Sequence, residues 1–529
     1  MSRRGSSLVA VGILFSRVTG LVRQRVIAFY LGQGPAADIL NAAFRIPNFL
    51  QNLFGEGALS ASFIPSYSRL LGQGRDKEAR QLASAVLTLL TLLVAVVVLL
   101  GELATPVLVA MLVPKWHGPQ RDATEVLVRI LFPGAGLLVV SAWCLGVLNS
   151  HRRFLLSYAS PVVWNLAIIL AVFLFASKSD HGHFINVAAW GSLSGSLLQV
   201  AVQWPVVRRV GGTIGLATWR GVAEVRTVIT AFVPNLVSRG ANQISAFIDL
   251  SLASFLPAGA VAAMANAQVL YTLPVSLFGM AISAAELPEM SREQGDSETV
   301  ARALRIRLGA ATQRLAFYIV PSAVGFLALG GVIAGAIFQT GAFKLTDSTF
   351  VWIILGGSSI GLLASTLGRL YASTFYALHD TTTPLRCGIV RVTLTGVLGV
   401  LAALLLPDLL GIDHKWGAAG LTASAGIAGW VEFMLLRRSL CLRLGQFALP
   451  MGELAKLWLA AGIAALTGTA LRLAMPGPYE HERPLLVALV VVPAHVIVYL
   501  GLTTWLSIPE AAVLSERSRM IARTVFRRP

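Results

Sequence analysis

Residues 82–100 read LASAVLTLLTLLVAVVVLL, a run of 19 residues without a charged side chain. An α-helix rises about 1.5 Å per residue, so a helix of this length crosses a hydrocarbon layer of about 30 Å. Similar apolar runs recur from one end of the chain to the other, and no large soluble domain fits between them. The sequence therefore predicts an all-α polytopic membrane protein.

The composition supports lipid as part of the surroundings. Of 529 residues, 56% are hydrophobic and 13% are charged, against roughly 25% charged in soluble domains. The net charge of +17 would suit nucleic acid, but the basic residues lie in short joints between apolar runs, as in membrane topology. Cys144, Cys387 and Cys441 form no CxxC pair, so we expect no disulfide framework, metal site or cofactor.

Apolar windows of about 20 residues, separated at charged or Gly/Pro-rich joints, predict about 14 transmembrane helices. The first carries Arg17, Arg23 and Arg25 in its body, so we interpret it as a retained helix rather than a signal peptide. The predicted spans are 7–31, 36–63, 82–113, 125–149, 154–177, 185–207, 228–256, 260–287, 308–339, 350–375, 385–407, 416–436, 453–474 and 484–506.

The chain also contains an internal repeat. Ser16-Arg17 recurs as Ser238-Arg239 at an offset of 222, and Pro161 recurs as Pro384 at an offset of 223. The pattern PxxSR at 65–69 recurs at 288–292, again at 223. Chance identity is the alternative, but three landmarks in one order favour two homologous six-helix lobes related by an axis along the membrane normal. The predicted regions are an N-lobe 1–220, a C-lobe 221–445, two additional helices 446–510 and a basic tail 511–529.

Basic residues are concentrated in alternate joints between the predicted spans. One set of joints includes Arg69, Arg75 and Lys77, whereas the opposite set offers few cations, such as Lys115 and Arg121. Because cytoplasmic joints carry the excess of Lys and Arg, both termini are expected in the cytoplasm.

Two predicted spans carry polar stripes, and ionisable residues at membrane depth normally face a cavity or one another. Spacings of three and four residues place each stripe on one helical face, which predicts facing walls of a hydrated cavity. The stripe in span 36–63 consists of Asp38, Asn41, Arg45, Asn48 and Asn52, and continues to Glu56; that in span 228–256 consists of Asn235, Arg239, Asn242 and Asp249.

The arginines indicate an anionic substrate, because guanidinium donates paired hydrogen bonds to phosphate oxygens and stays charged. Arg17 and Arg23 lie about 120° apart on a straight helix, and a bend at Gly20 would point both inward. Structural alternatives remain open: Arg23 and Arg25 could reach an interface, and Asp38 could neutralise Arg45. Asp249 is a candidate ion site or a structural residue.

Four segments resemble the MurJ/MviN lipid II flippase family of the MOP exporter superfamily. Residues 16–23, SRVTGLVR, are similar to its SRxxGxxR signature, and residues 44–60, FRIPNFLQNLFGEGALS, are similar to its PNxL and EGAxS segment. Further matches are GVLNS at 146–150 and FYALHDTTTP at 375–384. The resemblance implies two six-helix lobes in a V around a cationic cavity, with two C-terminal helices that form a groove for a lipid tail.

The resemblance also implies site residues. The family's functional arginines fall on Arg17 and Arg23, its aspartate on Asp38, and its PN and EG residues on Asn48 and Glu56. Two positions that are commonly arginine in the family are Gln51 and Val269 here. Arg239, Arg25 or Arg45 would then have to compensate for the missing charges.

We therefore expect a transporter without catalytic residues that flips lipid II from the cytoplasmic to the outer face of a bacterial inner membrane. No GxxxxGK[ST] loop is present, so the energy is expected from an ion gradient such as that of sodium, from the membrane potential, or from substrate supply and removal. Expected partners are lipid II, membrane lipids and the cell-wall synthesis machinery. The alternatives are a polyprenyl-linked polysaccharide flippase, a MATE-type exporter, a membrane-embedded glycosyltransferase and a scaffold protein.

Overall fold

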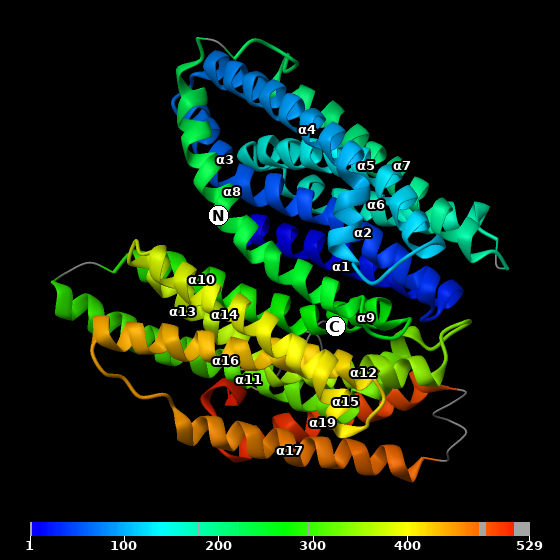
Figure 1. The fold of residues 1–529 in the computed structure, drawn as a ribbon. Coiled ribbons are helices and arrows are strands. Elements are labelled where there is room, and N and C mark those ends of the chain that lie inside the picture. Colours follow the sequence, from blue (N-terminus) through cyan, green and yellow to red (C-terminus); the bar gives the residue numbers. More distant parts are fainter. Residues whose placement is uncertain (1–2, 178, 220, 294–295, 476–482, 513–529) are drawn as a thin grey trace, which may run out of the picture. The chain divides into compact units, whose positions relative to one another are not determined.

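The computed structural model describes residues 3–177, 179–219, 221–293, 296–475 and 483–512. Within some helices the side chains are also outside the described set, among them those of Glu56 and Arg239. The described residues form helices and no strand, which confirms the all-α fold. They divide into two compact units, within 1–262 and 263–529 (Figure 1). The lobes predicted from the internal repeat, 1–220 and 221–445, are not tested by this division and stay a prediction.

The N-terminal unit contains eight long helices and the start of a ninth. Its helices are α1 (Arg3–Leu31), α2 (Pro35–Phe54), α3 (Glu56–Gly72), α4 (Asp76–Leu112), α5 (Pro119–Ser150), α6 (Phe154–Phe175), α7 (His181–Gly211) and α8 (Ala223–Ala253), followed by α9 (Ala260–Pro274), which continues into the second unit. The predicted span 36–63 is broken at Gly55, between α2 and α3.

The C-terminal unit contains the remaining helices. They are η1 (Val275–Met280, π-helical), α10 (Ala281–Ser291), α11 (Ser297–Phe338), α12 (Leu345–Ile360), α13 (Leu362–Ala377), α14 (Thr382–Val400), η2 (Leu401–Leu405, π-helical), α15 (Leu406–Leu410), α16 (Trp416–Leu444), α17 (Met451–Ala474) and α19 (Pro484–Trp505).

Each predicted span lies on one of these helices or on a broken series of them. Within the described residues, nine helices are long and apolar enough to cross a membrane, and α12 with α13 forms a tenth candidate bent by 42°. The sequence did not predict this bend. Gly361 at the bend packs on the backbone of α16, where an added Cβ would lie 2.3 Å from the Cα of Gly426. The prediction of about 14 crossings exceeds these candidates and stays a prediction.

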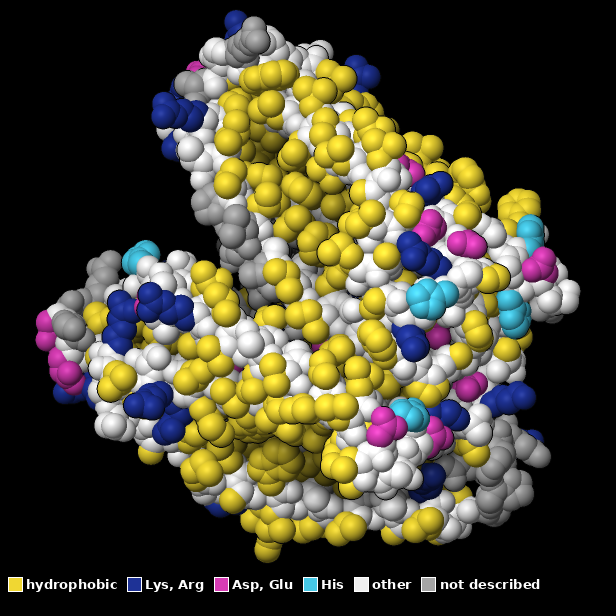
Figure 2. Space-filling view, viewed as in Figure 1, with side chains coloured by type: hydrophobic (Ala, Val, Ile, Leu, Met, Phe, Trp, Pro, Cys, Tyr) yellow, Lys and Arg dark blue, Asp and Glu magenta, His cyan; other side chains and the backbone are white. Residues whose placement is uncertain are grey.

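Apolar side chains cover much of the visible surface of the helices, while charged side chains gather toward their ends (Figure 2). Leu103, Phe173 and Leu466 are each more than 70% exposed. Large exposed apolar side chains of this kind are expected where a helix faces hydrocarbon chains.

Helix α5 forms much of the core of the N-terminal unit. Trp143 is fully buried and its ring centroid lies 6.4 Å from that of Phe63 on α3. A buried chain of hydrogen bonds also joins α5, α6 and α7: Gln199 donates to Ser141, which donates to Gln203 Oε1, and Gln203 donates to Ser160. Such interhelical hydrogen bonds in membranes contribute about 0.6 kcal/mol each.

Helix α11 is joined to α19 by side-chain hydrogen bonds near a proline. Pro321 lacks an N–H, so the carbonyl of Phe317, four residues earlier, loses its helical partner. The Tyr499 hydroxyl of α19 donates to that carbonyl at 2.7 Å, and the His495 ring lies 3.2 Å from the carbonyl of Pro321. The last helix is therefore attached to α11 at its proline.

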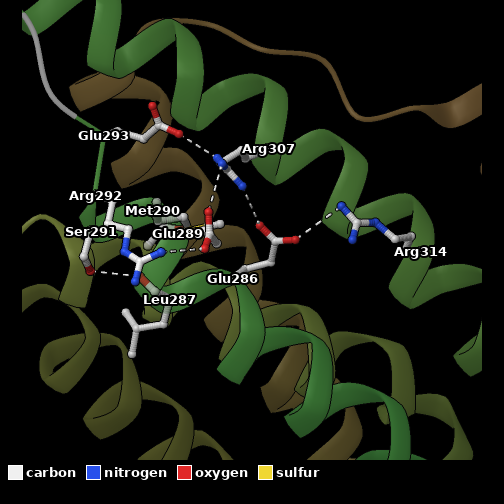
Figure 3. Close-up of polar contacts among 10 residues, drawn as sticks. Glu286, Leu287, Glu289, Met290, Ser291, Arg292, Glu293, Arg307 and Arg314 are labelled. Carbon is white, nitrogen blue, oxygen red and sulfur yellow. Dashed lines mark hydrogen bonds and ion pairs between the residues drawn. The ribbon is translucent and has the colours of Figure 1, made fainter. Parts of the chain in front are cut away.

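A cluster of ion pairs joins α10 to α11 (Figure 3). Glu286, whose side chain is 8% exposed, lies 3.6 Å from Arg307 and 3.2 Å from Arg314. Arg307 also pairs with Glu293 at 2.6 Å and with Glu289 at 3.4 Å. These contacts fix the helix that follows the π-helical segment η1 to the first half of α11.

Replacement of Tyr499 tests the attachment of α19. Tyr499→Phe removes the donor to Phe317, so we expect a loss of stability of about 0.5–1.5 kcal/mol. In a Pro321→Ala background the new N–H can satisfy Phe317, so the same change should cost little. Thermal unfolding of the four purified proteins in detergent measures the difference, and an equal cost in both backgrounds would contradict the proposed role of Pro321.

Candidate functional site

Helix α8 runs antiparallel to α2 and α3 within the N-terminal unit. Near the start of α8, Glu224 pairs with Arg69 of α3 at 2.8 Å. Farther along α8, the ring centroid of Phe247 lies 5.9 Å from that of Phe49 on α2. The two helices that carry the predicted polar stripes are therefore in contact.

Asp38 lies at the far end of this contact and is 2% exposed. Its carboxylate oxygens accept hydrogen bonds from the backbone N–H of Gly259 at 2.6 Å and of Ala262 at 2.8 Å. Gly259 directly precedes α9 and Ala262 lies in its first turn, where N–H groups have no earlier helical carbonyl to bind. Gly259 has φ +91°, and an added Cβ would lie 2.7 Å from the carbonyl oxygen of Gln33. Asp38 therefore caps α9 from another helix, with both carboxylate oxygens occupied.

Arg45 lies two turns farther along α2, where it is half-buried. The carboxylate of Asp249 on α8 interacts electrostatically with its guanidinium. The two predicted stripes thus contribute opposite charges to one region. The structural alternative suggested Asp38 as the partner of Arg45, whereas the structure gives it Asp249 of α8.

Arg23 of α1 has aromatic neighbours on two other helices. Its guanidinium carbon lies 4.6 Å from the ring centroid of Trp164 on α6 and 5.9 Å from that of Phe44 on α2. The indole N–H of Trp164 donates to Ser192 of α7, at 3.1 Å to the carbonyl and 3.2 Å to the hydroxyl, which fixes the ring. Nε and Nη1 of Arg23 are buried and form no hydrogen bond with any residue that the structure describes.

The other predicted site residues are less closely defined. Arg17 is exposed, Arg25 and Asn48 are half-buried, and α1 continues through Gly20 without a break. Glu56 begins α3 and Arg239 lies within α8, but both side chains are outside the described set.

The sequence reasoning missed the aromatic support of Arg23 and the partner of Asp38. Trp164 lies three residues after Pro161, a landmark of the internal repeat, so its position near that landmark was a usable signal. The positive φ of Gly259 had no such signal, because many glycines precede helices in this chain.

The segment FYALHDTTTP forms the turn between α13 and α14. His379 adopts a left-handed conformation with φ 57°. The Asp380 carboxylate accepts the backbone N–H groups of Thr383 and Thr382 and pairs with Arg443 at 2.8 Å. The Thr383 N–H, together with these other contacts, holds the pKa of Asp380 below its ordinary value. This motif therefore caps α14 and joins it to α16.

Comparison with known proteins gives the relationship of the chain. Residues 27–475 match the family described as "Lipid II flippase MurJ". A probable lipid II flippase MurJ of Haemophilus influenzae is 32% identical over 71% of this chain and 76% of its own length.

The chain belongs to the lipid II flippase MurJ family.

A further relative agrees with this assignment, and two solved structures have a similar fold. The lipid II flippase MurJ of Burkholderia cenocepacia is 30% identical over 80% of each chain. A solved structure described as "Lipid II flippase MurJ, inward closed conformation" has a TM-score of 0.77 over 94% of this chain and 98% of its own, at 22% identity. An inward-facing MATE transporter of the MOP superfamily has a TM-score of 0.64 over 81% of this chain and 96% of its own, at 17% identity. These two structures share the fold.

Arg23 provides the first test of the site. Arg23→Ala removes the donors, so we expect transport to fall at least about tenfold, since hydrogen bonds to charged groups contribute about 1.5–3 kcal/mol. Arg23→Lys should recover only part, because a point charge replaces a planar group that stacks on Trp164. Growth rescue of flippase-depleted cells at matched expression measures both, with Arg302→Ala as the exposed control. Full rescue by Arg23→Ala would remove this residue from the site.

Asp38 is tested by stability as well as transport. Asp38→Ala leaves the Gly259 and Ala262 N–H groups without their acceptor, so we expect a loss of about 1–3 kcal/mol. Asp38→Asn keeps one acceptor oxygen and should be intermediate. Thermal unfolding in detergent measures the loss. An Asp38→Ala protein as stable as the wild type but inactive would assign Asp38 to substrate contact instead.

Proposed function

We propose that the chain moves lipid II from the cytoplasmic to the outer face of the bacterial inner membrane by alternating access, without making or breaking a bond. Both termini would lie in the cytoplasm, as the basic joints favour. The family assignment supports lipid II as the substrate. The residues of this chain supply the recognition chemistry.

The observation that carries this proposal is the state of Arg23. Two aromatic rings fix the guanidinium, yet Nε and Nη1 have no hydrogen-bond partner among the described residues. Buried donors without partners are costly, and each calls for an explanation. Separate oxygens of a diphosphate could accept charge-assisted hydrogen bonds from Nε and from Nη1, and the rings hold these donors in place.

Arg17 and Arg45 would bring further positive charge to the substrate head group. Gln51 and Val269 stand where the family resemblance leads us to expect arginine, so two positive charges are missing. Arg239, on the helix that contacts α2, is the proposed replacement. Asn48, Asp38 and Glu56 complete the proposed site, with Asp38 acting through the position of α9.

Energy would come from a sodium ion gradient or the membrane potential. One charge moved through 100 mV gains about 2.3 kcal/mol, enough to bias a transport cycle. Asp249 is the proposed ion site. Because its carboxylate interacts with Arg45, a cation bound there would compete with the guanidinium and release Arg45 toward the substrate. Contacts with the cell-wall synthesis machinery are also proposed.

Complementation tests the proposed function directly. Expression of this chain in cells depleted of their lipid II flippase should restore growth and outward exposure of the precursor, because the fold and the arginines would serve the same substrate. An Arg17→Ala, Arg23→Ala double variant at equal membrane level is the matched control and should fail. A correctly inserted wild-type chain that does not expose the precursor would refute the proposal.

A further inference from the structure

Helix α13 has one face that is not buried, and that face is polar. Most of its other residues, including Leu363, Leu367 and Leu370, are buried in the C-terminal unit, whereas the small Ala372 and Ala377 are partly exposed. The unburied face carries Ser365, Arg369, Ser373 and Tyr376, at spacings of four, four and three residues, with Arg369 and Tyr376 exposed. A helical face toward hydrocarbon would be apolar, and an arginine there would be costly, so this face meets water.

A carboxylate lies beside this face in a notch formed by two glycines. Glu432 of α16 has its oxygens 3.7 Å and 4.0 Å from where a Cβ would stand on Gly368 of α13 and Gly388 of α14. Arg391, one turn beyond Gly388, pairs with Glu432 at 3.1 Å. The Glu432 side chain is 16% exposed and that of Arg391 is 37% exposed.

The three charges lie deep within their helices. Arg369 lies about 12 Å before the end of α13, and Arg391 about 13 Å after the start of α14, at about 1.5 Å per residue. The exposed apolar residues Leu385, Ile389 and Val397 form a stripe along α14. Arg391 lies about 120–160° around the helix from each of them, and about 100° from Val390, which is also exposed. Arg391 therefore points away from the apolar face of its own helix.

We propose that Arg369 and Arg391 form an anion-binding wall of the C-terminal unit, with Glu432 as the positioning residue, which contacts anionic groups of the substrate during transport. Only Nη1 of Arg391 pairs with Glu432 within the described residues, which leaves its Nε and Nη2 edge for a ligand. Arg391 neutralises Glu432, and Arg369, which follows the glycine that Glu432 approaches, adds one net positive charge to this part of the unit. The inference rests on the proposed function and adds binding residues to it.

Lipid II offers two kinds of anion, a diphosphate and peptide carboxylates, and either can bind a guanidinium fork. The test uses the purified full-length chain with two probes, undecaprenyl diphosphate and lipid II, and native mass spectrometry to measure binding. Arg391→Gln and Arg369→Gln should each raise Kd about tenfold. A loss for both probes identifies the diphosphate as the ligand, and a loss for lipid II alone identifies the carboxylates.

The rival role for Arg391 is neutralisation of Glu432 alone. Arg391→Gln would then weaken binding only by leaving a buried carboxylate unpaired, and Arg391→Gln with Glu432→Gln would restore wild-type affinity. Our proposal expects the double variant to fold and still bind about tenfold more weakly. Arg438→Gln, an exposed arginine on α16, is the control and should bind as the wild type.

Three results would overturn the wall. These are wild-type affinity in both single variants, restored affinity in the double variant, and equal weakening by Arg438→Gln. A wild-type chain that binds neither probe would instead contradict the proposed function, and the inference would fall with it. The proposal is supported if Arg391→Gln and Arg369→Gln each weaken binding, if the double variant with Glu432→Gln still binds more weakly than the wild type, and if Arg438→Gln binds as the wild type.

Discussion

The pairing of Asp38 with the first turn of α9 is the constraint on which the described site depends. A helix start leaves N–H groups without partners, and the membrane interior offers little water to satisfy them. Asp38 supplies both acceptor oxygens from α2, so the position of α9 is tied to α2. The positive φ of Gly259 allows the close approach. With this end fixed and Arg69 paired with Glu224 at the other, α8 is held along α2 and α3.

Arg23 differs from Asp38, because two of its buried nitrogen atoms have no hydrogen-bond partner within the described residues. At several other places a neighbouring helix satisfies buried polar groups, as where Tyr499 donates to the carbonyl left free by Pro321, or where Gln203 connects α5, α6 and α7. The rings of Trp164 and Phe44 orient the guanidinium of Arg23. Its Nε and Nη1 donors form no hydrogen bond with the described residues. Buried donors of this kind carry a desolvation penalty unless a ligand accepts their hydrogen bonds.

Much of the fold could be predicted from the sequence because hydropathy and helix length act locally. The spans follow from spacing and composition, although the break at Gly55 interrupts a span that was expected to be one helix. The bend at Gly361 could not be predicted, because it reflects close packing on Gly426, 65 residues away. The partners of Asp38 and Arg23 were missed for the same reason. The spacing of residues along a helix predicts which face a side chain lies on. It does not predict which backbone group or aromatic ring of another helix the side chain contacts.

The most direct test of the central claim is an experimental structure of the chain with lipid II bound. The account predicts a diphosphate oxygen about 2.7–2.9 Å from Nε or Nη1 of Arg23, with the guanidinium still stacked on Trp164. A bound lipid II whose phosphates lie elsewhere, while Nε and Nη1 of Arg23 remain without a partner, would contradict it.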